Sequence, residues 1–355
     1  MKILQVCPRY HPYIGGIEVH VKEISERLVE RGFEMEVLSC DPSGKLPRDE
    51  IVNGVRVRRF KSWAPNEAYY FSKELKKHLM KNSDNFDIVH AHSYGAFPAL
   101  YAAQAKCKNK LVFTPHYVGG GGTFFRNLLH IPYRLITSEL FTRADKVICV
   151  SKYEMEVLRS RFKVEYEKLE FIRNGVRLSE FSRLKKIRKN CKVILCVSRL
   201  EKYKGVQHTV IALQKLDHSI FLEIVGKGPY RNSLIKLAKK LNVYNRVRFY
   251  QDLQREELLQ RYAMADVFVL ASEREAMPIT IAEALAAKVP CIVSKIPFLL
   301  EWIDNENCFG IECPINNDEL VNLLNKVIVT TIKGVELPDW NDVTYDLEEV
   351  YNSLF

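Results

Sequence analysis

The chain alternates between short apolar runs and helical segments along nearly all of its length. Strand-like runs are predicted at residues 1–7, 33–39, 86–90, 110–115, 146–150 and 168–172, and again at 192–197, 220–225, 246–250, 266–270 and 291–294. Helices are predicted at 17–31, 96–106, 124–143 and 152–162, between the runs of the second series, and at 341–355. Helices that separate short strands predict parallel sheets with right-handed crossovers. A hairpin is also predicted at 50–60, with Asn53-Gly54 as its turn.

The alternation is interrupted once, which predicts two domains. Residues 174–190, NGVRLSEFSRLKKIRKN, are polar and basic, and they resemble a linker. A chain of 355 residues is also too long for a single compact core. We therefore predict a first domain at 1–178 and a second at 179–340, with the last helix, 341–355, crossing back to the first domain.

Composition excludes several classes of protein. The apolar share of 47% and the charged share of 27% are those of a globular protein. The nine cysteines form no C-x-x-C pair and no zinc-type cluster, so we expect a reduced cytoplasmic protein with no structural metal. We expect no signal peptide and no membrane span. The net charge of +10 favours an acidic partner, but no nucleic-acid motif accompanies it, and surface lysines that aid solubility explain the same charge.

The stretch from Ser272 to Pro290 places two carboxylates near the end of a buried strand. The apolar run ADVFVLA is followed by a loop that carries Glu275 and by a helix that we expect to begin at Pro278. Glu283 lies inside that helix, on the side that we expect to face Glu275. Open α/β sheets bind ligands at the carboxyl ends of their strands. A helix-dipole partner and a solvated helix residue are the alternative interpretations of the two glutamates.

Other candidates follow other predicted strands. Gly15 and Gly16 lie between a strand and a helix, where backbone N–H groups can receive a phosphate, although a plain tight turn explains them too. His116 follows a strand and precedes Gly119–Gly122, which we expect to form a mobile loop. A histidine used only in packing is the alternative.

The segment SRLEKYKG, at the first strand end of the second domain, carries two cations. Arg199 and Lys204 suit a diphosphate, because Arg offers bidentate hydrogen bonds and Lys offers a compact charge. Gly226 and Gly228 end the next strand and would let a ligand approach the backbone, and Asn174 lies at the domain junction. Solvated lysines and simple turns are the alternatives.

The order of these segments resembles glycosyltransferase family 4, the retaining nucleotide-sugar transferases. The resemblance rests on GGIEVHVKEISERLVERGFEMEVLS, VHAHS, FTPHY, ADKVICVS, IRNGV, SRLEKYKG, VGKGP and the pair of glutamates, and it covers nearly the whole chain. It implies an α/β protein of GT-B architecture, with two Rossmann-like doubly wound parallel-sheet domains that face each other across a cleft.

The resemblance also implies roles for single residues. Glu283 would hold the ribose hydroxyls and Glu275 the transferred sugar, while Arg199 and Lys204 would neutralise the leaving diphosphate. His116 would lie near the anomeric carbon and Gly16 under the phosphate. The implied donor-binding residues are Gly15, Gly16, Asn174, Gly226, Gly228, Met277, Pro278, Ile279 and Glu283. No D-x-D triplet occurs, so we expect no metal and no cofactor beyond the donor itself.

The expected partners are a UDP- or GDP-sugar and a saccharide or lipid-linked acceptor. The basic amphipathic segments at 69–80 and 124–136 would suit an anionic membrane surface on the inner face of the cell membrane, or they simply pack on the core. Ala276 and Pro278 replace glycines that are usual in the family. A degenerate nucleotide-sugar-binding protein is therefore one alternative function, and a sugar epimerase on the same fold is another.

Overall fold

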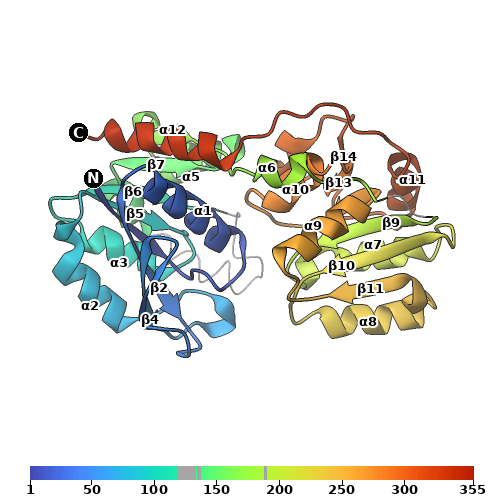
Figure 1. The fold of residues 1–355 in the computed structure, drawn as a ribbon, viewed down its shortest axis with the longest axis horizontal. Helices are drawn as coiled ribbons and strands as arrows, with labels where there is room; N and C mark the ends of the chain where they lie inside the picture. The colour runs from blue at the N-terminus through green and yellow to red at the C-terminus, as the bar shows by residue number, and fades with distance from the viewer. Residues whose placement is uncertain (118–132, 134–136, 188–189) are drawn as a thin grey trace. The chain divides into compact units, whose positions relative to one another are not determined.

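Two mainly parallel β-sheets account for the alternation that the sequence predicts (Figure 1). The computed structural model describes residues 1–117, 133, 137–187 and 190–355. The chain divides into a first unit, Met1–Asn174 with Trp340–Phe355, and a second unit, Gly175–Asp339. The last segment thus belongs to the same unit as the start of the chain.

The sheet of the first unit has the strand order β3-β4-β2-β1-β5-β6-β7-β8. Its strands are β1 (Lys2–Cys7), β2 (Glu34–Asp41), β3 (Asp49–Val52), β4 (Val55–Lys61), β5 (Ile88–His92), β6 (Lys110–Thr114), β7 (Lys146–Cys149) and β8 (Leu169–Phe171). All neighbouring strands pair in parallel except β3 and β4, which form the predicted hairpin. Asn53 and Gly54 both have positive φ angles there, as a tight hairpin turn with right-handed strand twist requires.

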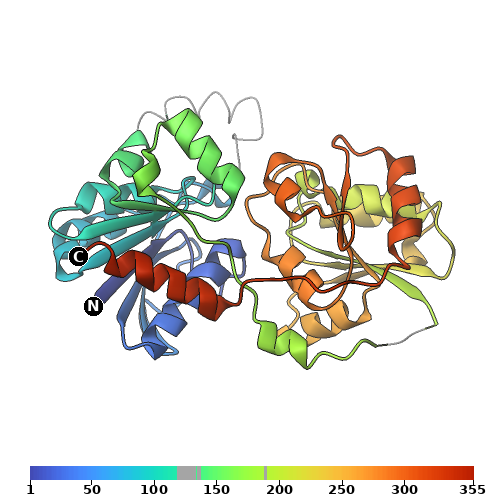
Figure 2. The same cartoon turned by 90° about the horizontal axis from the view of Figure 1, so that it is seen from above.

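The helices described in the first unit are α1 (Gly16–Glu30), α2 (Lys73–Asn82), α3 (Phe97–Ala105), α5 (Lys152–Phe162) and α12 (Trp340–Asn352). Helix α1 buries Val21, Ile24 and Leu28 on one face, which follows from their spacing along the helix. Helix α12 lies beside α1, as Figures 1 and 2 both show, and Trp340 at its start is only 1% exposed. The predicted helix at 124–143 falls mostly outside the described residues.

The sheet of the second unit has the order β11-β10-β9-β12-β13-β14 and is parallel in every pair. Its strands are β9 (Lys192–Val197), β10 (Ile220–Val225), β11 (Val247–Tyr250), β12 (Val267–Leu270), β13 (Cys291–Ser294) and β14 (Cys308–Ile311). Its helices are α6 (Leu178–Ser182), α7 (Val206–Leu213), α8 (Arg231–Lys240), α9 (Arg255–Met264), α10 (Ile279–Ala286) and α11 (Asn317–Val327). The strand order reverses direction between β9 and β12, and ligands bind at such switch points in doubly wound sheets.

The strands of the second unit are continuous apolar runs, which suits burial on both faces of the sheet. In β12, Val267 and Val269 enter one core cluster, while Phe268 and Leu270 enter the cluster on the opposite face of the sheet. Both faces of the strand are therefore buried, as expected for a parallel sheet that is covered by helices on both sides.

The predicted linker at 174–190 contains a short helix. Residues Leu178–Ser182 form helix α6, and Phe181 is buried in the core of the second unit together with Val176. The first unit consequently ends at Asn174, before the boundary expected after residue 178. The apolar positions in this segment are too few to show periodicity, which is why the sequence predicted only a linker.

Candidate functional site

The carboxyl edge of the second sheet brings together residues from both sides of its switch point. The chain leaves β9 through Arg199 and Lys204 before α7 begins, and it leaves β12 through Glu275 before α10 begins. Since β9 and β12 are neighbours, their loops meet at this edge. The two segments that the sequence singled out separately thus form one constellation, the switch-point site.

Lys204 and Glu275 form a close, largely buried ion pair. The Lys204 ammonium donates a hydrogen bond of 2.6 Å to Glu275 Oε1, and the two side chains are only 12% and 9% exposed. Arg199 is more open, at 51% exposure, and it contacts Glu201 at 3.4 Å and the hydroxyl of Tyr203 at 3.1 Å. The edge therefore presents one buried cation and one exposed cation.

Three glycines let the backbone segments at this edge approach each other. Gly205, Gly226 and Gly228 all have φ angles between +73° and +155°, which glycine tolerates best. A Cβ atom at Gly205 would lie 1.8 Å from the carbonyl oxygen of Ala271, so no side chain fits. At Gly226 and Gly228 a Cβ atom would strike the carbonyl oxygens of Ser198 and Leu200 at 1.9 and 2.2 Å. Gly226 and Gly228 thus shape the loop around Arg199.

Three buried hydroxyls at the same edge have no protein partner. Ser198, Ser272 and Ser294 follow or end the neighbouring strands β9, β12 and β13, and the Oγ atom of each is buried without a hydrogen bond among the described residues. Buried polar atoms are normally paired, so each unpaired hydroxyl calls for a water or a ligand atom. Because these three hydroxyls lie at the ends of neighbouring strands, this edge of the sheet is polar.

Glu283 does not point freely toward Glu275 as the sequence predicted, because other residues hold both its oxygens. Arg255 donates to Oε1 at 2.5 Å and the Tyr262 hydroxyl donates to Oε2 at 2.9 Å. Burial alone would lower the pKa of Arg255, but the charges and hydrogen bonds of Glu283 and Glu180 together outweigh it and raise that pKa. Each carboxylate oxygen keeps one further lone pair for a ligand.

The start of helix α10 also differs from the prediction. The helix begins at Ile279, and Pro278 is its extended N-cap residue (ψ 117°) rather than its first helical residue. Pro278 still has no N–H to donate, which agrees with its place outside the helix. Met277 is 7% exposed and Ile279 is half-buried, so both lie at the same strand-to-helix connection.

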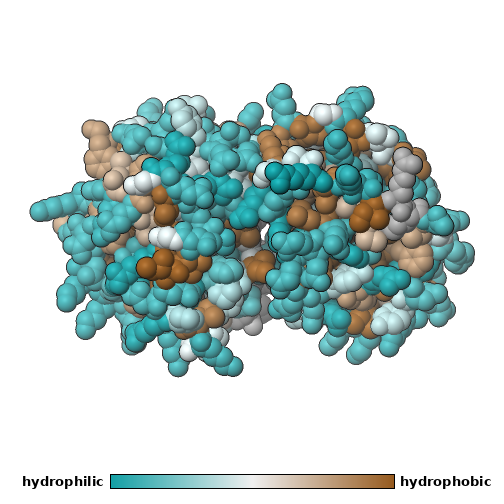
Figure 3. Space-filling view, in the orientation of Figure 1, coloured by the Kyte–Doolittle hydropathy of each residue, from teal (hydrophilic) through white to brown (hydrophobic). Residues whose placement is uncertain are grey.

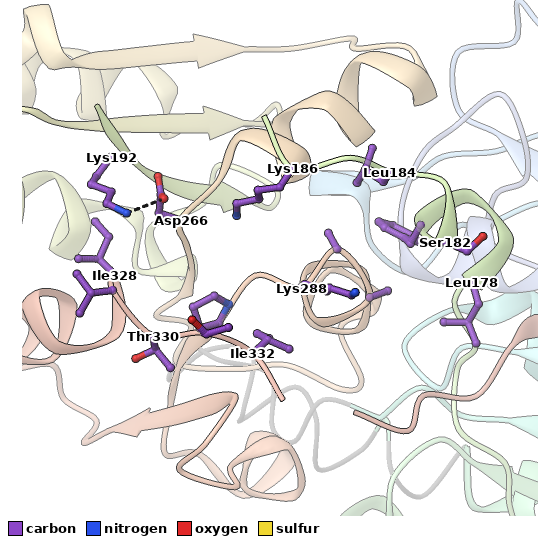
Figure 4. A pocket seen from close by; sticks show the side chains of 16 residues that line it. Leu178, Ser182, Leu184, Lys186, Lys192, Asp266, Lys288, Ile328, Thr330 and Ile332 are labelled. Atoms are coloured by element: carbon purple, nitrogen blue, oxygen red, sulfur yellow. Dashed lines mark hydrogen bonds and ion pairs between the residues drawn. The ribbon is translucent and has the colours of Figure 1, made fainter. Parts of the chain in front are cut away.

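A pocket of about 670 Å³ lies at the opposite, amino edge of this sheet (Figure 4). Lys192 begins β9 there and donates to Asp266 at 3.2 Å, and Lys186 donates to the carbonyl oxygen of Ala265. Lys288 also lines this pocket and has a positive φ angle of 59°. None of the predicted site residues lines this pocket, so we do not assign the function to it.

In the first unit, Gly15 and Gly16 lie at the start of α1. Gly15 is the N-cap residue, and a Cβ atom on Gly16 would have no neighbour within 4 Å, so the space beside the helix start is open. Glu18 folds over Gly15 and is paired with Arg9 at 2.8 Å. The free N–H groups of this helix end can therefore face a small anion at Gly16.

His116 follows β6 in a strained backbone conformation, with a φ angle of 47°. Buried Glu154, at the start of α5, holds the adjoining loop by accepting hydrogen bonds from the N–H groups of Tyr117 (2.6 Å) and Val150 (2.8 Å). Burial raises the pKa of Glu154 to about 7. Gly119–Gly122, predicted as a mobile loop, lie outside the described residues.

The structure gathers further histidines beside His116 that the sequence did not single out. His20 from α1 lies with its ring centroid 4.9 Å from that of His116, and His92 from the end of β5 lies at 5.7 Å. His90 packs behind His92, with a centroid distance of 4.2 Å. Burial lowers the pKa of His20 to about 4, and it holds the pKa values of the other three well below the usual range. All four rings are therefore neutral at pH 7.

Among the described residues, His20, His92 and His116 are the group of three whose possible ligand atoms lie close enough together to hold one metal ion. One ring nitrogen of each lies within 4.8 Å of one ring nitrogen of the other two. These residues are distant in the sequence, so no spacing rule could have found them. The sequence offered one indication, namely that each of these histidines belongs to or follows a strand–loop–helix connection. These connections lie around the first switch point, between β1 and β5.

Asn174 lies in the first unit rather than among the donor-binding residues of the second. Its side-chain oxygen is 2.8 Å from His20 Nδ1, and the residue is 6% exposed. The predicted site residues are thus divided, with His116, Gly15, Gly16 and Asn174 in one unit and the others in the second.

The basic segment at 69–80 packs on the core of the first unit through helix α2. Leu75 and Leu79 are fully buried, while Lys73, Lys76 and Lys77 are exposed on the other side. Trp63, which stacks on Phe71, remains 68% exposed. On the face shown in Figure 3, hydrophilic side chains dominate and the hydrophobic ones form separate groups. Among the described residues, no helix is both long and apolar enough to cross a membrane.

Comparison with known proteins gives two family matches that together cover most of the chain. Residues 14–180 match the model of Glycosyltransferase Family 4, and residues 179–333 match Glycosyl transferases group 1. An uncharacterized glycosyltransferase of Methanocaldococcus jannaschii is 30% identical, over 86% of this chain and 83% of its own length. Glycogen synthase of Mycobacterium tuberculosis is also 30% identical, over 88% and 82%.

Solved structures share the fold over the whole chain. Sucrose-phosphate synthase from Thermosynechococcus elongatus has a TM-score of 0.81 at 18% identity, covering 100% of this chain and 99% of its own. Anabaena HepE, solved in complex with UDP-glucose, has a TM-score of 0.79 at 19% identity, covering 99% and 100%. These similarities show that the two parallel-sheet domains have the GT-B architecture.

Proposed function

Because the chain belongs to the group 1 glycosyltransferases, we propose that it moves a hexose from a UDP- or GDP-sugar to a saccharide or lipid-linked acceptor. We further propose that the anomeric configuration is retained, that no metal is required, and that the reaction takes place in the cytoplasm. The nine free cysteines agree with a reducing compartment.

The ion pair between Lys204 and Glu275 is the observation that carries this proposal. Both side chains are nearly buried at the switch point of a doubly wound sheet, where ligands bind. Burying two charges is costly, and replacing such a pair with apolar residues is often neutral for stability. A functional use for the two charges explains their presence better than stability does.

The leaving diphosphate is the group that these cations suit. When the bond between the anomeric carbon and the diphosphate oxygen breaks, negative charge builds on that oxygen. Lys204 offers a fixed charge and Arg199 can move in to make bidentate hydrogen bonds. The unpaired hydroxyls of Ser198 and Ser272 can donate to phosphate oxygens beside them. Charge stabilisation that grows in the transition state raises the rate, and it can do so here without a metal.

The two glutamates suit the hydroxyl groups of the donor. Glu275 accepts hydrogen bonds from the transferred sugar while it holds Lys204 in place. Glu283, held by Arg255, accepts hydrogen bonds from the ribose through its remaining lone pairs. Gly226 and Gly228 let the end of β10 pack closely against the backbone on either side of Arg199, which places Arg199 at this edge.

In the first unit, His116 and Gly16 complete the proposed reaction. On this proposal, the open helix start at Gly16 would receive a phosphate oxygen, and the neutral ring of His116 would act near the anomeric carbon. The acceptor oxygen forms its new bond on the face that the diphosphate leaves, and its proton passes to the departing phosphate oxygen. This same-face attack gives retention without an enzyme nucleophile.

A peripheral membrane site fits a lipid-linked acceptor. Exposed Trp63 and the lysines of α2 lie in the first unit, and an aromatic ring with nearby cations favours an anionic lipid surface. The net charge of +10 acts in the same direction.

Thermal unfolding with a panel of UDP-, GDP-, ADP- and dTDP-sugars tests the donor site. A ligand at a hundred times its Kd stabilises the folded protein by about 2.7 kcal/mol, which raises the Tm visibly. The variant Glu283→Gln keeps the shape of the side chain but loses its charge, and Glu256→Gln changes an exposed glutamate of α9 as a control.

We expect nucleotide sugars that carry one particular base to raise the Tm of the wild type and of Glu256→Gln. The same ligands should raise the Tm of Glu283→Gln by less. The ligand that binds is then tested for transfer. Binding without transfer or hydrolysis would indicate a degenerate nucleotide-sugar-binding protein, and isomerisation of the sugar would indicate an epimerase. If no nucleotide sugar binds, the proposed donor site is wrong.

A further inference from the structure

Beyond the proposed function, the histidine cluster of the first unit has the geometry of a transition-metal site. We propose that His20, His92 and His116 together bind one divalent transition-metal ion of the zinc class. The proposed transfer itself needs no metal, but it shares His116 with this ion site. It would lie at the first switch point, between the ends of β1 and β5.

The spacing of the three rings matches a single shared ion. Three imidazoles around a tetrahedral ion, with metal–nitrogen bonds of about 2.0–2.1 Å, place their ring centroids about 5 Å apart. The observed centroid distances are 4.9 Å for His20–His116, 5.5 Å for His20–His92 and 5.7 Å for His92–His116. The rings of His92 and His116 are within 23° of parallel, and the ring of His20 stands edge-on to both, at 63° and 81°.

The nitrogen atoms match as well. His92 Nδ1 and His116 Nε2 are 3.4 Å apart, which is long for a hydrogen bond between two ring nitrogens. Two ligands of a tetrahedral ion at the bond length above are separated by about 3.4 Å. The distance therefore suits two ligands of one ion better than a direct hydrogen bond.

Neighbouring amides orient two of the rings toward the cluster. His20 Nδ1 lies 2.8 Å from the side-chain oxygen of Asn174, and His92 Nε2 lies 2.6 Å from that of Gln5. Because an amide oxygen only accepts, each of these ring nitrogens carries the proton, and the lone pair is on the nitrogen that faces the cluster. Outer acceptors of this kind fix the tautomer of metal-binding histidines in proteins.

The remaining histidine, His90, does not belong to the site because both its nitrogens are occupied. Its Nδ1 is 2.7 Å from the Tyr351 hydroxyl and its Nε2 is 2.7 Å from the Thr114 hydroxyl. His20 and His92 are buried and His116 is half-buried, so an ion can enter on the His116 side. Three protein ligands also leave a fourth position open for water.

Cobalt titration of the metal-free full chain tests this proposal. Tetrahedral Co²⁺ absorbs visible light, and a bound Co²⁺ should also quench Trp340, whose ring centroid is 5.7 Å from that of His20. We expect one equivalent to bind, with both signals saturating together. His20→Gln should weaken binding by more than the 10- to 100-fold that is typical for loss of an outer partner. His218→Gln, at an exposed histidine of the second unit, should leave binding unchanged.

Zinc-edge X-ray absorption of the wild type makes the test independent of whether a variant folds. Three nitrogen ligands at about 2.0–2.1 Å are expected, whereas sulfur at about 2.3 Å would place the ion on a cysteine and overturn the proposal. Absence of stoichiometric binding, or equal affinity in His20→Gln, would overturn it too. Because these are direct binding measurements, the result does not depend on transferase activity. Inhibition of transfer by zinc through His116 is a consequence that does rest on the proposed function.

Discussion

Substitutions at the two ends of the Lys204–Glu275 ion pair should move the affinity for a free nucleoside diphosphate in opposite directions. Lys204→Met removes the fixed cation, while Glu275→Gln keeps the side-chain shape but removes the carboxylate that competes with phosphate for the ammonium. The pair is 2.6 Å long and its side chains are 12% and 9% exposed, so the solvent screens neither charge strongly.

The magnitude follows from the strength of a hydrogen bond to a charged group, about 1.5–3 kcal/mol. Loss of Lys204 should therefore raise the Kd for the diphosphate by roughly 10- to 150-fold. Glu275→Gln should lower the Kd of the free diphosphate, but it should also reduce the preference for the sugar-bearing donor over the diphosphate, because the sugar loses its acceptor.

Isothermal titration with the diphosphate and the matching nucleotide sugar measures both effects. Lys215→Met is the matched control, since Lys215 is also ion-paired, with Asp318, but lies beyond the far end of α7 and is 56% exposed. Its Kd values should equal those of the wild type. A change of less than threefold in Lys204→Met, or shifts of the same sign in Lys204→Met and Glu275→Gln, would refute the assignment of Lys204 to the diphosphate.

Three further predictions concern the scaffold and the surface. Gly205→Ala should lower the free energy of unfolding by about 1–3 kcal/mol in denaturant titrations, because its Cβ atom meets a backbone carbonyl, whereas Gly334→Ala, with open space around it, should change little. The folded-state pKa of Glu154, about 7, lies above its ordinary value of 4.5, so its contribution to stability is complete below pH 4.5 and is lost as the pH rises through 7. The loss amounts to about 3 kcal/mol, and a flatter pH profile for Glu154→Gln in thermal or denaturant unfolding would confirm the cause. Sedimentation with anionic vesicles at low salt should fall when Trp63 and Lys76 are both changed to Ala, and equal binding to neutral vesicles would contradict an electrostatic contribution.

Local patterns predict every strand except β14, most helices and the loops that meet at the switch-point site. The reason is that buried parallel strands are continuous apolar runs, and their carboxyl ends are followed directly by the loops in question. Lys204 and Glu275 are 71 residues apart, yet strand order alone brings them together.

Contacts between side chains from unrelated segments could not be predicted in this way. Arg255 reaches Glu283 from α9, and nothing in the spacing of either residue indicates the partner. His20 and His92 join His116 only because β1, β5 and β6 are neighbours in the sheet. Helix α6 was missed because its five residues are held by burial of Phe181 rather than by helical periodicity.

The most direct test of the account is the stereochemistry of transfer in the presence of EDTA. With the donor that the wild type binds, NMR of the isolated product should show the same anomeric configuration as the donor, and EDTA should not reduce the rate. An inverted product, or a rate that EDTA abolishes and Mg²⁺ restores, would contradict a retaining reaction in which Arg199 and Lys204 replace a metal ion.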